Sequence, residues 1–280
     1  MQTGTHRKEA QHQYPRIPGR RLMLIGDHRS FYRGQLPEAA GRCFGGFVVY
    51  VALDVPFLLK KGQGAWETCE MAAVEPNRTH SLRGGDGFIG QVLLEHEDVC
   101  PASLPRWMTS GDGAIYDPAL IAHWRRVCEL VSSTDRAILN GHLDEALFGS
   151  ALERRALDCR IAQVIRNLQA HSGERHSAED CASQIGLSLS RFLHLFKQEV
   201  GVPFRRFRAW KRARGLLDII AQGGNLTDMA LDSGYSDSSH FSNSIRGIYG
   251  IKPKELVAAA RHMPTVRQGM PPSTGRSAAL

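Results

Sequence analysis

The fold of the second half of this chain is decided by the stretch Ala182-Ser183-Gln184-Ile185-Gly186-Leu187-Ser188-Leu189-Ser190-Arg191-Phe192-Leu193-His194-Leu195-Phe196. Ala182 has the small side chain that suits a crossing of two helices, Gly186 permits a tight turn, and Ser188 is a good N-cap for a second helix. Phe192 and Phe196 follow at helical spacing on one face of that helix. The spacing predicts a helix-turn-helix.

The same pattern recurs later in the chain. Ala230 and Gly234 repeat the separation of Ala182 and Gly186, and Tyr235, Phe241 and Ile245 follow as the apolar positions. The two copies also end alike, with Gly201-Val202-Pro203 and Gly250-Ile251-Lys252-Pro253. We interpret the motif as an internal repeat.

Residues from Leu157 to Arg261 resemble the DNA-binding domain of the AraC/XylS family of bacterial transcription regulators. The resemblance rests on the run Leu187 to Lys197, which matches the first recognition helix of the family, and on Gly234 to Ser242, which matches the second motif. The chain departs from many members at Leu256-Val257, where they have Tyr-Arg. The resemblance implies a sequence-specific activator with promoter DNA and RNA polymerase as partners, and not an enzyme.

Charge and cysteine usage agree with this interpretation but are less specific. The chain has 35 Lys and Arg against 28 Asp and Glu, a formal charge of +7, and a pI near 9.3. Basic residues are concentrated between Lys197 and Arg214, where Glu199 is the one acidic residue. This balance suits an anionic partner. The 6 cysteines form no Cys-x-x-Cys pair, which argues against a zinc ribbon and a disulfide framework.

Helix faces predict which side chains would read DNA. A helix that begins after Ser188 turns its aromatic residues inward and points five side chains outward, toward the major groove: Ser190, Arg191, Leu193, His194 and Lys197. A second helix, capped by Asp237, presents Ser238, Ser239, His240, Ser242, Asn243 and Arg246. We expect Asn243 to read adenine, because its amide can form two hydrogen bonds with that base. A linker helix from Phe204 to about Ile220 would set the spacing of the two motifs.

The first half of the chain has a different pattern. Between Leu22 and Val99, short β-rich runs such as 47–51 and 91–94 alternate with turn clusters such as 61–64 and 83–87. This predicts a small antiparallel β-barrel, and the resemblance implies a cupin-like one. The whole chain is therefore expected to be α+β: a barrel and helices, then an all-α domain with two helix-turn-helix motifs joined by a linker helix.

The predicted barrel offers a weak metal site and a better sensor pocket. His80 closes a run, 75–80, that resembles one half of a cupin motif, but the His-x-His half is missing. We therefore expect no metal, no cofactor and no catalytic residue. A pocket for a small-molecule effector is expected instead, with Phe47, Tyr50, Trp66 and His80 as candidate ligand-binding residues. The alternative is that these side chains only fill a core.

Two amphipathic helices, 118–131 and 135–148, are predicted after the barrel. By the resemblance they are candidates for a homodimer interface; alternatively, they pack only against their own barrel. The expected organisation is a disordered tail at 1–20, a sensor barrel at 21–115, the helical pair at 116–150, the DNA-binding domain at 156–261 and a second tail at 262–280. No signal peptide or membrane segment is evident, so a cytoplasmic protein is expected.

The sequence leaves three functions open. The first is a regulator, most simply an activator, controlled by a small molecule in the barrel. The second is a DNA-binding regulator without a ligand, controlled by a protein partner. The third is a metal-dependent cupin enzyme, which the isolated His80 disfavours. The effector, the operator sequence and the sign of regulation do not follow from the sequence.

Overall fold

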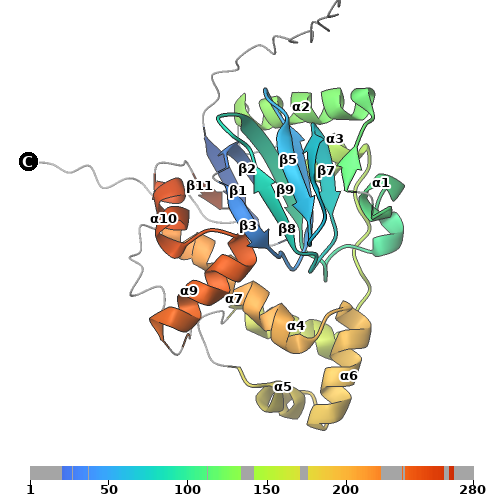
Figure 1. Cartoon of the computed structure of the whole chain (residues 1–280). Helices are drawn as coiled ribbons and strands as arrows, with labels where there is room; N and C mark the ends of the chain where they lie inside the picture. Colours follow the sequence, from blue (N-terminus) through green and yellow to red (C-terminus); the bar gives the residue numbers. More distant parts are fainter. Residues whose placement is uncertain are drawn as a thin grey trace, which may run out of the picture.

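The computed structural model describes residues 21–133 apart from 27, 37 and 112, and then 142–170, 176–221, 235, 237–261 and 265–267. Two β-sheets are built mainly from the first half of the chain (Figure 1). The seven-stranded sheet has the order β10-β7-β4-β9-β2-β1-β11, with β1 (Leu22–Ile25), β2 (Arg29–Gln35), β4 (Phe47–Ala52), β7 (Met71–Val74), β9 (Phe88–Leu94), β10 (Ala114–Ile115) and β11 (Thr265–Arg267). The four-stranded sheet has the order β3-β8-β5-β6, with β3 (Ala39–Arg42), β5 (Phe57–Lys61), β6 (Trp66–Cys69) and β8 (His80–Arg83).

The prediction of a closed barrel is wrong. The strands from β1 to β10 pair antiparallel, as expected, but they divide between two sheets. Both sheets are open, because the first and last strand of each pair with a neighbour on one side only. The expectation of a structureless tail after residue 261 also fails at Thr265–Arg267, which pair in parallel with β1. Local alternation of side chains predicts that a segment is a strand but does not say which strand is its neighbour.

Strand β4 explains why the sheet has helices on both sides. All six of its residues are buried, and strand geometry sends alternate side chains to opposite faces. Phe47, Val49 and Val51 enter one core, which includes Trp124. Val48, Tyr50 and Ala52 enter a second core, which is shared with helices from the far end of the chain. A continuous apolar run therefore marks a strand covered on both faces.

Helices α1 (Arg106–Thr109), α2 (Pro118–Ser133) and α3 (Leu143–Phe148) belong to the first of these cores. Helix α2 lies across the sheet at the top of Figure 1, and it approaches β9 closely at Gly90. A Cβ atom at Gly90 would lie 2.6 Å from Cys128 Sγ, so this crossing requires a glycine. The apolar face of α2 thus packs on its own sheet. Of the second predicted helix, residues 135–141 lie outside the described residues.

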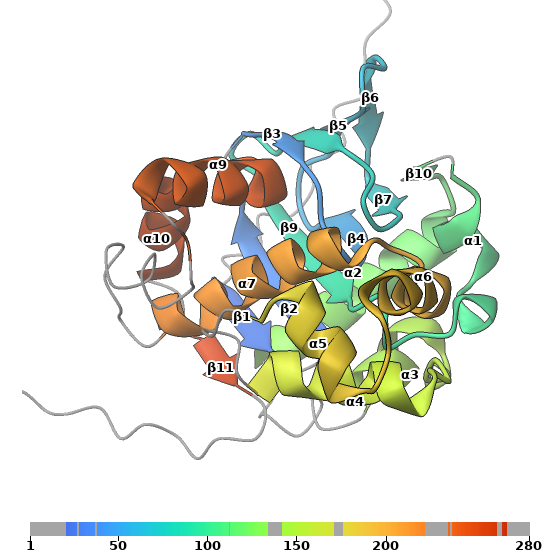
Figure 2. The ribbon, with the colours of Figure 1, turned by 90° about the horizontal axis from the view of Figure 1, so that it is seen from below.

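The remaining helices are α4 (Cys159–Ala170), α5 (Ala178–Gln184), α6 (Leu189–Val200), α7 (Phe204–Ala221), α9 (Ser238–Tyr249) and α10 (Pro253–Arg261). Helix α7 is the linker helix that the sequence predicts, and it lies between α4–α6 on one side and α9–α10 on the other (Figure 2). It packs on the sheet through Trp210, Leu217 and Ile220. None of the described helices is long and apolar enough to cross a bilayer.

A buried group of charges holds α7 against the sheet. Glu95 follows β9 and is 1% exposed. Its Oε2 atom accepts hydrogen bonds from Trp210 Nε1 (2.7 Å) and Lys211 Nζ (2.9 Å), and Arg214 Nε lies 3.2 Å from Oε1. Lys211 also pairs with Glu97. Burial alone would raise the pKa of Glu95, but Lys211, Arg214 and the hydrogen bond from Trp210 lower it below its usual value.

We expect Glu95→Gln to destabilise the fold by about 3–5 kcal/mol, because it leaves buried cations without their counter-charge. The measurement is urea unfolding followed by circular dichroism at neutral pH. Glu38→Gln is the matched control, since Glu38 pairs with Arg83 where both side chains are exposed. A loss below about 1 kcal/mol is expected there. Equal losses for the two variants would contradict the role given to Glu95.

Candidate nucleic-acid interface

The first helix-turn-helix is built as the sequence predicts. Helix α5 begins with a capping box between Ser177 and Asp180, and Gly186 has a φ of 66° in the turn that follows. Ser188 caps α6, and its Oγ accepts a hydrogen bond from the Arg191 N–H. These caps satisfy N–H groups that have no partner within the helix and so fix where each helix begins.

An aromatic cluster seats α6 on the beginning of α7. Phe192 and Phe196 are fully buried, and their rings lie 4.9 Å and 5.1 Å from the ring of Phe204. Phe207 adds a further edge-to-face contact with Phe196 at 5.2 Å. The inward face of α6 is thus fully occupied. The opposite side exposes all five side chains predicted to read DNA: Ser190, Arg191, Leu193, His194 and Lys197.

Helix α9 is the second predicted reading helix. Asp237 caps it and accepts a hydrogen bond from the His240 N–H at 2.7 Å. Phe241 and Ile245 are buried, as predicted, together with Ile248 and Tyr249. The six side chains predicted to face DNA are all exposed: Ser238, Ser239, His240, Ser242, Asn243 and Arg246. Ala230 and Gly234 of the second motif lie outside the described residues.

The C-terminal end of α9 is held by the sheet. Its last carbonyl groups accept hydrogen bonds from β3 and the residue after it: Ile248 from the Cys43 N–H (3.1 Å), Tyr249 from the Arg42 guanidinium (3.1 Å and 3.3 Å), and Gly250 from the Ala40 N–H (3.1 Å). A helix end leaves such carbonyls unpaired, so β3 completes the helix. The sequence gives no local signal of this contact, because Arg42 and Tyr249 are distant in the chain.

Helices α6 and α9 both end at a glycine that packs closely against the sheet side of the molecule. Gly201 ends α6 with a φ of 82°, and Gly250 ends α9 with a φ of 73°. A Cβ atom at Gly201 would lie 2.8 Å from Nε2 of His96, and one at Gly250 would lie 3.1 Å from Ala39 Cβ. Each glycine therefore allows the left-handed backbone conformation that ends the helix and also leaves room for a close packing contact.

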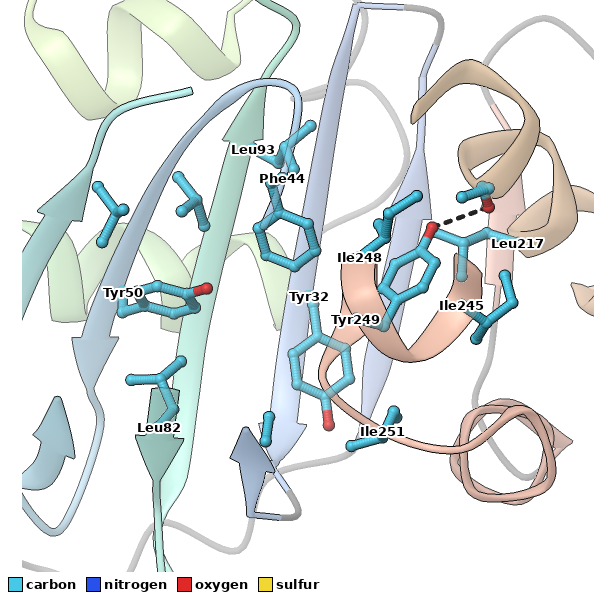
Figure 3. Close-up of a cluster of buried hydrophobic side chains, with 14 of the residues drawn as sticks. Tyr32, Phe44, Tyr50, Leu82, Leu93, Leu217, Ile245, Ile248, Tyr249 and Ile251 are labelled. Carbon is cyan, nitrogen blue, oxygen red and sulfur yellow. Dashed lines mark hydrogen bonds between the residues drawn. The ribbon is translucent and has the colours of Figure 1, made fainter. Parts of the chain in front are cut away.

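Tyr249 connects α9 to the linker helix. Its hydroxyl donates a hydrogen bond to the Ala213 carbonyl at 2.9 Å, and its ring packs edge-to-face on Phe44 (Figure 3). The shared core continues with Ile245, Ile248 and Leu217, which come from α9 and α7. Helix α9 is thus fixed to the sheet and to α7 through one apolar cluster.

A cavity lies where the sheet meets α7, α9 and α10. Its wall is largely apolar, with two arginines, Arg42 and Arg214, among the polar residues. The lining residues are Met23, Ser30, Phe31, Tyr32, Leu36, Arg42, Phe44, Gln91, Leu93, Trp210, Arg214, Leu217, Tyr249, Ile251 and Leu256. Arg42 donates hydrogen bonds to two neutral groups, the Tyr249 carbonyl and the Tyr50 hydroxyl.

The four residues predicted to bind a ligand do not line this cavity. Phe47 lies in the core under α2, and Tyr50 lies in the core shared with α7 and α9. Trp66 is half-buried under the guanidinium of Arg83 at 4.2 Å. Their role in ligand binding stays a prediction. The residues that do line the cavity could not be found from the sequence, because they come together only when the C-terminal helices pack on the sheet.

His80 is engaged at both ring nitrogens. Nδ1 lies 2.9 Å from the Arg78 carbonyl and Nε2 lies 2.8 Å from the Tyr50 hydroxyl. A carbonyl only accepts, so Nδ1 carries the proton and Nε2 accepts from Tyr50. Burial, together with the nearby charge of Arg42, lowers the pKa of His80 to about 3. Within the described ranges, His, Cys, Asp and Glu side chains form no group of three or more suited to a metal ion.

The comparisons with known proteins agree on the helical region. Residues 181–259 match a family model for a helix-turn-helix domain. InvF, an invasion protein of Salmonella typhimurium, is 30% identical over 94 residues, 33% of this chain and 44% of InvF. The transcriptional activator RhaS of Escherichia fergusonii is 32% identical over 102 residues, 35% of this chain and 36% of RhaS. Residues 181–259 are therefore similar to the helix-turn-helix domain of AraC-type transcription regulators. The chain spans less than half the length of these curated relatives.

Solved structures extend the likeness to the sheets. An apo variant of ToxT from Vibrio cholerae matches 83% of this chain and 98% of its own, with a TM-score of 0.56 and 13% identity. ToxT bound to (E)-4-(8-methylnaphthalen-1-yl)but-3-enoic acid matches over the same shares, with a TM-score of 0.51 and 11% identity. At such identities the likeness concerns the fold. The sheets and the AraC-type helices are therefore arranged as in a known fold.

The contacts of His80 predict an acid-sensitive contribution to stability. Because its folded pKa of about 3 lies below the unfolded value of about 6.5, this contribution is present above pH 6.5 and is lost as the pH falls. His80→Gln should make the decline of the unfolding free energy between pH 6 and pH 4 shallower by about 1.4 kcal/mol per pH unit. Urea unfolding at a series of pH values measures this slope. If the unfolding free energies of the two proteins fell in parallel with pH, His80 would take up a proton as readily in the folded protein as in the unfolded chain.

Proposed function

We propose that this protein is a sequence-specific DNA-binding transcription regulator, and more narrowly an activator, that uses α6 and α9 to read promoter DNA. The observation that carries the proposal is the pair of capped helices whose predicted reading side chains are all exposed while their opposite faces are buried. RhaS, which matches the same region, is named a transcriptional activator. Helix α7, with the basic residues Arg205 and Arg206 exposed near its beginning, would set the separation of the two reading helices.

Within this proposal some exposed side chains contact base edges and others contact phosphates. Arg191 and Asn243 lie on the exposed faces and have side chains that can pair with base edges. Lys197 lies in the last turn of α6, where a point charge suits a phosphate. RNA polymerase is the protein partner expected of an activator, and a homodimer is the expected assembly. The apolar face of α2 packs on the sheet of the same subunit. A dimer interface on α2 would therefore have to use the outer face of this helix.

We expect Arg191→Ala and Asn243→Ala to lose about 1–3 kcal/mol of discrimination between the preferred site and random DNA. Lys197→Ala should weaken binding to all DNA alike and reduce the salt dependence by about one counterion. Fluorescence anisotropy on a selected site and on random DNA, at several salt concentrations, measures both effects. Arg78→Ala is the control, since this exposed arginine lies in the sheet half. Equal losses on random DNA for all three variants would contradict the division of roles.

We further propose that a small molecule bound in the cavity between the sheet and the C-terminal helices controls DNA binding. Apolar walls together with Arg42 and Arg214 suit an apolar carboxylic acid. ToxT, which shares the fold, has been solved with such an acid bound. Arg42, Trp210, Arg214 and Tyr249 line the cavity and also bond the sheet to α7 or α9, so an occupant would touch the supports of the reading helices directly.

Octanoic acid is a suitable probe of this cavity. Isothermal titration calorimetry should give a saturable signal with the wild-type protein and none with Met23→Trp, which fills the cavity from β1. Val55→Trp is the control, because Val55 is 51% exposed and does not line the cavity. Binding that survives in Met23→Trp would place the acid elsewhere. A lack of binding in both proteins would favour control by a protein partner.

A further inference from the structure

The exposed face of α6 is partly apolar. Leu189 and Leu193 are 38% and 39% exposed, and they lie one helical turn apart. In the described part of the chain, three other large apolar side chains are equally or more exposed to solvent, and all of them lie outside the reading helices: Val55, Tyr116 and Leu130. A single exposed leucine needs no explanation, but a pair on the reading helix has a defined position relative to DNA.

The motif does not need this leucine pair in order to fold. The core of α6 is supplied by Phe192, Phe196 and Val200, all fully buried. Helix α9 provides an internal comparison. Counted from the N-caps Ser188 and Asp237, the positions of Leu189 and Leu193 correspond to Ser238 and Ser242, which are exposed as well. The second copy thus builds the same helix with hydroxyl groups where the first copy exposes leucines.

The surroundings of the leucine pair indicate its partner. Arg191, His194 and Lys197 share the exposed side of α6 with it. A basic surface that carries two apolar side chains suits the major groove, where the apolar group on the base edges is the C5 methyl of thymine. Side chains four residues apart on a helix lie about 5–6 Å apart at Cβ, which corresponds to one or two base steps of about 3.4 Å.

We propose that Leu189 and Leu193 together read thymine methyl groups on neighbouring base pairs, so that α6 selects a thymine-containing half of the binding site. This inference rests on the proposed DNA-binding function and adds a specificity-determining residue, Leu189, and a base preference. Helix α9, with serines at the matching positions, reads its own half without this requirement. The two halves of the operator therefore differ in chemistry.

The test uses DNA that lacks single methyl groups. The full-length protein first selects its preferred site from random duplexes, and each thymine of that site is then replaced by deoxyuridine, which removes only the C5 methyl. Each methyl contacted by α6 should contribute about fourfold to affinity, as expected for one buried carbon. Leu193→Ser and Leu189→Ser should each lose affinity for the thymine site and also lose the response to deoxyuridine at one position. Both variants introduce the residue that α9 already has.

Each outcome has a separate meaning. Val55→Ser is the control, because Val55 is 51% exposed and lies outside the reading helices, and it should leave the deoxyuridine response unchanged. If no sequence is enriched in the selection, the proposed function itself fails. If a site is enriched but the leucine variants respond to deoxyuridine as the wild type does, the leucine proposal is overturned and the regulator stands. Unchanged DNA affinity combined with lost transcription in the presence of RNA polymerase would overturn it as well, because the pair would then contact the polymerase.

Discussion

The carboxylate of Glu95 is the contact on which the arrangement of this molecule depends. It follows β9 and is almost fully buried, and it is neutralised by Lys211 and Arg214 from α7. A buried charge is tolerated only while its partners stay in place, so α7 cannot shift along the sheet without exposing uncompensated ions to an apolar core. Helix α6 packs on the beginning of α7, and Tyr249 of α9 donates a hydrogen bond to Ala213 in the middle of α7. The contact between Glu95 and α7 therefore fixes the positions of both α6 and α9.

The same contact explains how the two halves of the chain can influence each other. Trp210 donates to Glu95 and also lines the cavity, while Tyr249 lines the cavity and bonds to α7. A molecule in the cavity would therefore act on α7 and α9 together, and it can shift their arrangement only as far as it binds one arrangement more tightly than another. Glu97 lies at the same contact, and burial, together with the charge of Glu95, raises its pKa even though Lys211 is close.

The sequence predicted what depends on neighbours along the chain and not what depends on packing. The caps Ser188 and Asp237 and the inward aromatic residues place α6 and α9 correctly, because capping and helical periodicity are local. The division into two sheets, the strand after residue 264 and the bonds from Arg42 to α9 are non-local, so no periodicity encodes them. Glu95 shows the difference most clearly. In the sequence it belongs to an acidic run, 95–98, that resembles a solvated turn, and only the approach of α7 makes it a buried anchor.

The way in which the sheet side grips the two reading helices suits a protein that must hold them without covering them. Its contacts reach the C-terminal ends, through His96 at Gly201 and through β3 at Gly250, whereas the N-terminal ends are capped by their own residues, Ser188 and Asp237. Recognition helices of this class present mainly their N-terminal residues to base edges. Because each helix is held by its C-terminal end, the N-terminal residues of both helices stay exposed.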